Sequence, residues 1–233
     1  MLSVASLEKR YGDAPAVRGI DFDLEPGDLT VLIGRSGAGK TTLLRCLDGL
    51  ERPDSGTVRL DGTRPDPTDI ALVFQTGALI DGKSALETVL DGALGREPVW
   101  RELLGWHTAG EKRAAIERLH AVGLAGDAAR RVGDLSGGER QRVGIARALQ
   151  QEPRALLADE PVAALDPATA RSVLERLAAV VCERNLVGLV SLHQPRLAGG
   201  VADRYLGLSD GRVTLDAPAS DVDEARIAAV YDD

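Results

Sequence analysis

The chain is poor in aromatic residues, in lysine and in cysteine. Only 3% of its 233 residues are aromatic, so we expect a core built from Leu, Val, Ile and Ala. Lysine occurs only as Lys9, Lys40, Lys83 and Lys112, and arginine supplies the other positive charges. The cysteines, Cys46 and Cys182, lie in apolar, helix-like stretches. This pattern predicts two buried thiols in a reducing compartment and excludes a disulfide framework.

Positive charge and long apolar runs are also lacking. The formal net charge is −8, which argues against a nucleic-acid partner, because phosphate contacts need clustered Lys and Arg. No stretch approaches the roughly 20 apolar residues that span a bilayer, and the first residues do not follow a signal-peptide pattern. We therefore expect a cytosolic protein, or one that reaches a membrane through a partner.

One segment matches the pattern G-x-x-x-x-G-K-[ST] at every fixed position. It consists of Gly34, Arg35, Ser36, Gly37, Ala38, Gly39, Lys40 and Thr41, and Thr42 follows it. An apolar, strand-like run over 29–33 precedes the segment and a helix-like run over 41–47 follows, which is the context that the motif requires. Glycines let backbone N–H groups face phosphate oxygens, the lysine reaches the β- and γ-phosphates, and the Thr41 hydroxyl can bind Mg²⁺. The segment predicts a nucleotide-binding loop.

The order of the elements predicts an α/β fold of the P-loop NTPase (RecA-like) class. Strand patterns cover 2–7, 17–24, 56–62 and 70–74, helical periodicity dominates 76–153, and strands alternate with helices from 155 onward. Such alternation predicts a mainly parallel sheet covered on both faces. We expect one domain over 1–233. Residues 1–75 and 154–233 would form the core with an antiparallel β subdomain, and 76–153 an inserted α-helical subdomain.

Two further motifs narrow the class of nucleotide-binding protein. The strand-like run 156–158 ends in Asp159 and Glu160, where one carboxylate can bind Mg²⁺ and the next can polarise an attacking water. Carboxylates also commonly end strands at solvent, so this pair alone does not decide. The sequence Ser136, Gly137 and Gly138 opens a helix-like run and is a second anion-binding arrangement. It lies too far along the chain to belong to the first loop, which hints at a second nucleotide or a second subunit.

The segment 135–139 reads Leu-Ser-Gly-Gly-Glu, the signature of ATP-binding cassette proteins, and the chain resembles that family from end to end. Gln75 follows a strand as the family's Q-loop glutamine does, and His193 follows a strand as its switch histidine does. Tyr11 resembles the aromatic residue that stacks on adenine. Read alone, His193 and Tyr11 would be ordinary strand-end residues, but the order of all these motifs favours the family roles.

The resemblance implies a mechanism. Two copies would pack head to tail as a homodimer around two ATP molecules, each held between the phosphate loop of one copy and Ser136–Gly138 of the other. Glu160 would be the general base, His193 would contact the γ-phosphate, and Asp166 would connect the two sites. Gln75 and Asp159, with Thr41, would hold Mg²⁺ or its water. The helical subdomain would pass motion to membrane permease subunits, which a periplasmic or extracellular substrate-binding protein serves, so the chain would lie at the cytoplasmic face of the inner membrane.

The segment 92–106, with Trp100 and Trp106, resembles an insertion typical of phosphonate importers. These tryptophans could equally be core aromatics, and a phosphite importer would look nearly the same. A soluble cassette ATPase in a complex that cleaves carbon–phosphorus bonds is the alternative; DNA-repair and translation cassettes do not fit a chain of this length.

Some positions depart from the family pattern. Ala164 replaces the usual serine, and the segment 76–82 after Gln75 lacks the polar and aromatic residues often found facing the permease. Gly199 and Gly200 stand where the family continues a helix, at a cost of about 1 kcal/mol per glycine if the helix persists.

Overall fold

The computed structural model describes residues 1–74, 79–93 and 107–232. The chain begins with an antiparallel sheet of β1 (Leu2–Tyr11), β2 (Ala14–Leu24) and β4 (Ser55–Leu60), in the order β2-β1-β4. Leu2, Val4 and Leu7 of β1 are buried; alternation accounts for Leu2 and Val4, and a register shift between Val4 and Leu7 adds one residue before Leu7. The predicted antiparallel strands are confirmed, and β1 and β2 are longer than the sequence pattern indicated.

A second sheet contains the strands that carry the nucleotide motifs. It consists of β3 (Leu29–Ile33), β5 (Ile70–Val73), β6 (Ala155–Asp159), β7 (Val187–Ser191), β8 (Arg204–Ser209) and β9 (Arg212–Pro218). The order is β5-β6-β7-β3-β8-β9, and every neighbouring pair is parallel except the hairpin β8–β9. The predicted α/β fold with a mainly parallel sheet is therefore confirmed.

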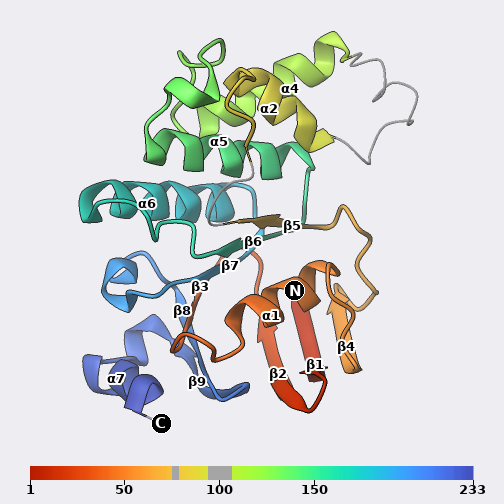
Figure 1. The fold of residues 1–233 in the computed structure, drawn as a ribbon, viewed down its shortest axis with the longest axis vertical. Coiled ribbons are helices and arrows are strands. Elements are labelled where there is room, and N and C mark those ends of the chain that lie inside the picture. Colours follow the sequence, from red (N-terminus) through yellow and green to blue (C-terminus); the bar gives the residue numbers. More distant parts are fainter. Residues whose placement is uncertain (75–78, 94–106, 233) are drawn as a thin grey trace.

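Helices cover both faces of this sheet (Figure 1). Helix α6 (Pro167–Glu183) lies on one face and α1 (Lys40–Asp48) on the other. Successive residues of β3 therefore pack on opposite faces of the sheet. Val31 belongs to the apolar cluster that contains residues of α6, and Leu32 belongs to the cluster that contains residues of α1 and of the antiparallel sheet. Helix α7 (Glu224–Asp232) packs on β8 and β9 near the carboxyl end of the chain.

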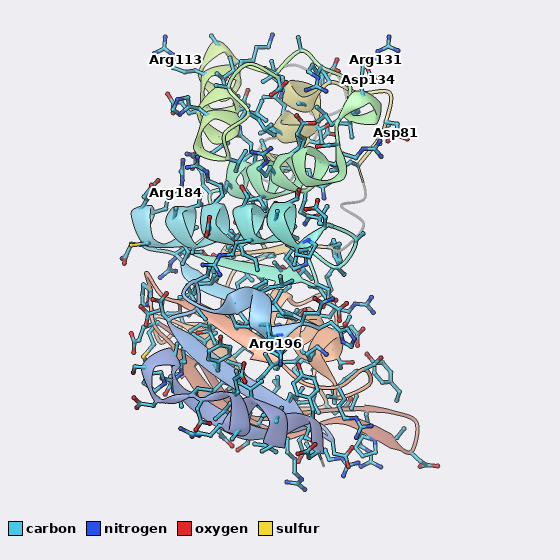
Figure 2. All side chains as sticks on the ribbon, turned by 90° about the vertical axis from the view of Figure 1, so that its left-hand side faces the viewer. Asp81, Arg113, Arg131, Asp134, Arg184 and Arg196 are labelled. Carbon is cyan, nitrogen blue, oxygen red and sulfur yellow. The ribbon has the colours of Figure 1, made fainter. Side chains whose placement is uncertain are left out.

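A layer of helices lies beyond α6 (Figure 1). It comprises α2 (Ala85–Leu90), α4 (Ala109–Ala121) and α5 (Gly137–Gln150), with 3₁₀ turns at Asp91–Ala93 and Val132–Asp134. Further 3₁₀ turns occur at Pro195–Ala198 and Ala219–Asp221. In Figure 2, Asp81, Arg131 and Asp134 lie together at the outer end of this layer, while Arg184 marks the end of α6.

The structure differs from the sequence-based expectations at Cys182 and after His193. Cys46 is buried as predicted, but Cys182 is exposed, because α6 buries Leu177, Val180 and Val181 and its helical period turns residue 182 to solvent. The helix after His193 does not persist, since the 3₁₀ turn ends at Ala198 and Gly200 has a left-handed φ of 73°. Among the described residues, no helix has the length and apolar character that crossing a bilayer demands.

Candidate nucleotide-binding site

The carboxyl ends of three adjacent parallel strands, β6, β7 and β3, meet at one edge of the second sheet. The phosphate loop follows β3, Asp159 ends β6 with Glu160 next, and His193 comes two residues after the end of β7. Parallel sheets bind ligands at this edge, outside the carboxyl ends of their strands. The fold therefore gathers motifs that lie more than a hundred residues apart in the sequence.

Glycines shape the phosphate loop at two points of close approach. Gly34 has φ 152° and Gly39 has φ 102°, and a Cβ at these positions would stand 2.2 Å from the Leu208 carbonyl oxygen and 2.3 Å from the Ala16 carbonyl oxygen. Side chains are excluded at both places by backbone rather than by movable groups. Gly37 is different, because its Cβ would meet open space despite a φ of 83°. Arg35, Ser36 and Gly37 are exposed, whereas Ala38 is buried.

Lys40 is held by the loop in which it lies. Its ammonium donates hydrogen bonds to the carbonyl oxygens of Gly34 (2.7 Å) and Arg35 (3.1 Å), and the residue is only 5% exposed. Burial lowers the pKa of this ammonium, and the nearby carboxylates of Glu160 and Asp159 oppose that change. A positive charge is therefore fixed between the loop and the two acids of β6.

The start of α1 differs from the starts of α2, α4, α5 and α6. Its N-cap is the left-handed Gly39, with no side-chain hydrogen bond to the first turn. Helices α2, α4, α5 and α6 are all capped, by Ser84, Thr108, Ser136 and Asp166 respectively. The first N–H groups of α1 thus remain available to an anion, and the partial positive charge of the helix end favours one. This arrangement fits a nucleotide phosphate.

The acids after β6 are connected through Ser191. The Ser191 hydroxyl donates to Asp159 Oδ1 (2.8 Å) and accepts from the backbone N–H of Glu160 (2.8 Å). Glu160 has a left-handed φ of 46°, which is uncommon for a residue with a side chain. Both acids are half-buried, and His193 is exposed.

Tyr11 ends β1 and is 49% exposed. Its hydroxyl donates to the Glu51 carboxylate, and burial, followed by this bond, raises the pKa of the phenol, while a hydrogen bond with Thr42 opposes the rise. The ring therefore lies beside the first turn of α1, next to Thr42, with Thr41 exposed in the same turn. An exposed aromatic face at this place fits the predicted contact with a nucleobase.

The signature segment lies elsewhere in the chain. Figure 1 shows α5 separated from α1 by α6 and the sheet. Ser136 caps α5 through a reciprocal pair of bonds with Glu139. A Cβ on Gly138 would stand 2.4 Å from Thr169 Cγ2, and one on Gly137 would stand 3.0 Å from Leu165 Cδ2. The signature turn thus packs against the start of α6, where the Asp166 carboxylate accepts from the Ala168 and Thr169 N–H groups.

Three predicted residues cannot be placed in the site, and the structure adds two residues that the sequence did not indicate. Gln75, Trp100 and Trp106 lie outside the described residues. The sequence analysis did not identify Ser191, although a polar residue at the end of an otherwise apolar strand can indicate a functional position. Tyr231 of α7 was also missed: its hydroxyl accepts from the Gly34 N–H at 3.3 Å, and nothing in the sequence indicates this contact.

Comparison with known proteins identifies the family. Residues 17–163, more than half of the chain, match the profile described as "ABC transporter". The chain belongs to the ABC transporter family. It is an ATPase cassette that binds nucleotide, as the signature and the phosphate loop predicted.

Relatives of the cassette agree over its whole length. It is 70% identical over 233 residues to "Phosphonates import ATP-binding protein PhnC 1" of Natronomonas pharaonis, covering 100% of both chains. It is 41% identical to "Hypophosphite import ATP-binding protein HtxD" of Stutzerimonas stutzeri, over 99% of this chain and 70% of that protein. A solved ATP-binding cassette, a dimer in a post-hydrolysis state with ADP and Pi, has a TM-score of 0.78 and 28% identity, covering 94% of this chain and 98% of that one.

Proposed function

We propose that the cassette is the ATP-hydrolysing subunit of an importer for phosphonates or related phosphorus oxyanions. The observation that carries this proposal is the 70% identity, without a gap in coverage, to a phosphonate import ATP-binding protein. The 41% identity to a hypophosphite import protein supports the wider class of phosphorus oxyanions. The cargo itself would be selected by a permease and a binding protein, and the cassette would sit peripherally at the cytoplasmic face of the membrane.

The residues at and near the sheet edge would have separate roles in binding and hydrolysing ATP. Lys40 and the first N–H groups of α1 would bind the β- and γ-phosphates, and Tyr11 would stack on the adenine. Glu160 would accept the proton of the attacking water, and His193 would contact the γ-phosphate. The carbonyl oxygens of Gly34 and Arg35 already hold the Lys40 ammonium within the loop that would receive the phosphates.

Magnesium fits the donors that surround the loop. Mg²⁺ usually binds one or two carboxylates together with substrate phosphates and water, and does not need a dedicated cage of side chains. Asp159 and the Thr41 hydroxyl, with Gln75, would hold it. Among the described residues no cluster of three or more His, Cys, Asp or Glu side chains forms a metal site by itself. When bound, Mg²⁺ would neutralise charge on the phosphate oxygens.

A second copy would complete each site. Ser136–Gly138 would approach the γ-phosphate bound by the partner's loop, and Asp166 would lie near the interface. The separation of α5 from α1 within one chain supports this division (Figure 1). We propose that 76–153 acts as the helical subdomain facing the permease, and that 1–75 with 154–233 acts as the nucleotide-binding core. Asp81, in the segment expected to face the permease, lies at the outer end of the helical layer (Figure 2).

Replacing the proposed base tests the hydrolytic assignment. Glu160→Gln should lower kcat by about 100-fold or more while ATP affinity stays close to that of the unchanged chain, because binding depends on the loop. Glu183→Gln makes the same chemical change at the exposed end of α6 and should leave kcat unaltered. Near-normal hydrolysis by Glu160→Gln would remove Glu160 from this role.

Transport is tested by adding a permease. Co-expression with a phosphonate-type permease should move the cassette to the membrane fraction and support phosphonate uptake, which Glu160→Gln should abolish. Purification with soluble phosphonate-cleaving enzymes instead of the permease would support the alternative role and contradict the importer.

A further inference from the structure

Ser191 occupies a central place at the edge that carries the chemistry. It is the last residue of β7, is 0% exposed, and stands in register with Asp159 of β6 on one side and Leu32 of β3 on the other. Its strand is otherwise apolar: Val187, Gly188, Leu189 and Val190. A buried hydroxyl is costly unless it is bonded, so its partners decide what it contributes.

The Ser191 hydroxyl is both a donor and an acceptor, and its partners are Asp159, the proposed Mg²⁺ ligand, and Glu160, the proposed base. The hydroxyl donates a hydrogen bond to Asp159 Oδ1, with 2.8 Å between the two oxygens. The same oxygen accepts a hydrogen bond from the Glu160 N–H at 2.8 Å. A hydroxyl has one proton, so the bond to the carboxylate fixes the direction of the other. One buried atom therefore joins the side chain of Asp159 to the backbone of Glu160.

The backbone at Glu160 needs such support. The register between β6 and β7 ends at the pair Asp159 and Ser191, so the Glu160 N–H lies beyond the strand pairing of the two. Its φ of 46° is a left-handed conformation that costs free energy for any residue with a Cβ. The hydroxyl supplies the acceptor that this turned peptide would otherwise lack.

We propose that Ser191 is a positioning residue for ATP hydrolysis, which orients the Asp159 carboxylate and sets the backbone turn from which Glu160 reaches the attacking water. This inference rests on the proposed function. Ser191 acts through its neighbours and does not touch the nucleotide, so it is distinct from the residues that bind phosphate.

The test compares two substitutions at this position. Ser191→Ala should lower kcat about tenfold and raise the Mg²⁺ concentration for half-maximal rate several-fold, because the acids lose their common partner. The KM for ATP should change by less than about twofold, since Lys40 and the start of α1 are untouched. Ser191→Thr keeps the hydroxyl on a strand residue and should stay within about threefold of the unchanged chain in all three quantities.

A matched control separates positioning from stability. Thr30→Val removes another buried hydroxyl from the same sheet, near the start of β3 and away from the carboxyl edge. It should alter neither kcat nor the Mg²⁺ dependence, whatever it does to the melting temperature. If Ser191→Ala folds poorly, Ser191→Cys provides the measurement, because a thiol of similar size is a weak donor and should behave as alanine does.

The outcomes distinguish this inference from the proposed function. Wild-type kcat and Mg²⁺ dependence in Ser191→Ala or Ser191→Cys, with Glu160→Gln inactive, would overturn the role of Ser191 alone. A loss in Ser191→Ala that Ser191→Thr does not restore would also overturn it, since the hydroxyl would not be the cause. Full activity of Glu160→Gln would instead contradict the assignment of the base.

Discussion

Lys40 shows how a single residue can be prepared for its ligand. The loop carbonyls of Gly34 and Arg35 hold the ammonium, so its long side chain is already ordered. Ordering a lysine side chain costs conformational entropy, and here folding has met that cost before any phosphate arrives. The preorganised charge should contribute to nucleotide affinity.

Replacing this lysine should weaken nucleotide binding. Lys40→Ala should raise the dissociation constant for ATP by about tenfold or more, because a buried charge aimed at phosphate is lost. Calorimetric titration with ATP measures the effect. Lys83→Ala is the matched control, since Lys83 pairs with Asp91 at 2.7 Å in the helical layer. Equal affinities for the two variants would contradict the role of Lys40.

Asp48 predicts a dependence of stability on pH. Burial raises the pKa of this carboxyl from 3.8 to about 6. The folded state thus favours the protonated form, so the stability that Asp48 contributes is present in acid and is lost as pH rises through about 6.

Asp48→Asn should therefore raise the melting temperature increasingly as pH rises from about 4 to about 6, and by a constant amount above that, because the amide carries no charge to bury. Thermal denaturation at several pH values measures this. Asp13→Asn, at an exposed position between β1 and β2, should show no such trend. A stabilisation by Asp48→Asn that is equal at every pH would contradict the explanation.

Among single residues, the sequence predicted the strand and helix on either side of the phosphate loop and the strand that ends at Asp159. It did not indicate the bonds of Ser191, which depend on the register between β6 and β7. It was wrong about Cys182, since an apolar helix segment does not reveal which side of the helix faces solvent.

The starts of several helices carry capping residues that can be read from the sequence. The start of α6 was predictable, because Asp166 followed by Pro167 is a strong helix-start signal. The starts of α2, α4 and α5 have capping boxes of Ser or Thr with Glu three residues later. What the sequence could not show is how these helices pack, because packing joins residues that are distant in the chain.

The contact between α5 and α6 gives a prediction about these elements. Gly138→Ala should lower the free energy of unfolding by about 1–3 kcal/mol, since the new Cβ would stand 2.4 Å from Thr169 Cγ2. Thr169→Ser removes that methyl group and keeps the hydroxyl, so the double variant should recover most of the loss. Urea denaturation of both single variants and the double variant measures the coupling. Additive effects would show that Thr169 is not the cause.

As a whole, the molecule carries two anion-binding arrangements, one at the edge of the parallel sheet and one at the start of α5, which we propose to meet across a dimer interface. The fold class follows from the order of strands and helices, and the comparison with a dimeric cassette agrees with it. The pairing of the surfaces between copies could not follow from one chain alone, because it is a property of the assembly.

Dimer formation should depend on both surfaces. Glu160→Gln with ATP and Mg²⁺ should elute as a dimer in size-exclusion chromatography, since slow hydrolysis leaves the nucleotide in place. Adding Ser136→Glu should return it to a monomer with unchanged ATP affinity, because a carboxylate would face the γ-phosphate of the other copy. Glu160→Gln with Glu117→Gln, a change on the exposed side of α4, is the control. A persistent dimer in the Ser136→Glu background would contradict the head-to-tail arrangement.

Two hydrogen bonds connect β3 and the phosphate loop to residues far along the chain. Gly34 bonds to Tyr231, 197 residues later, and Leu29 bonds to Asp203, 174 residues later. Both strands that flank β3, β7 and β8, also come late. A ribosome adds roughly 5–20 residues per second, so about 10–40 s separate the loop from its last partner. During that interval the nascent chain carries a complete motif without a finished site, and nucleotide can stabilise the fold only after Asp203 and Tyr231 have been added.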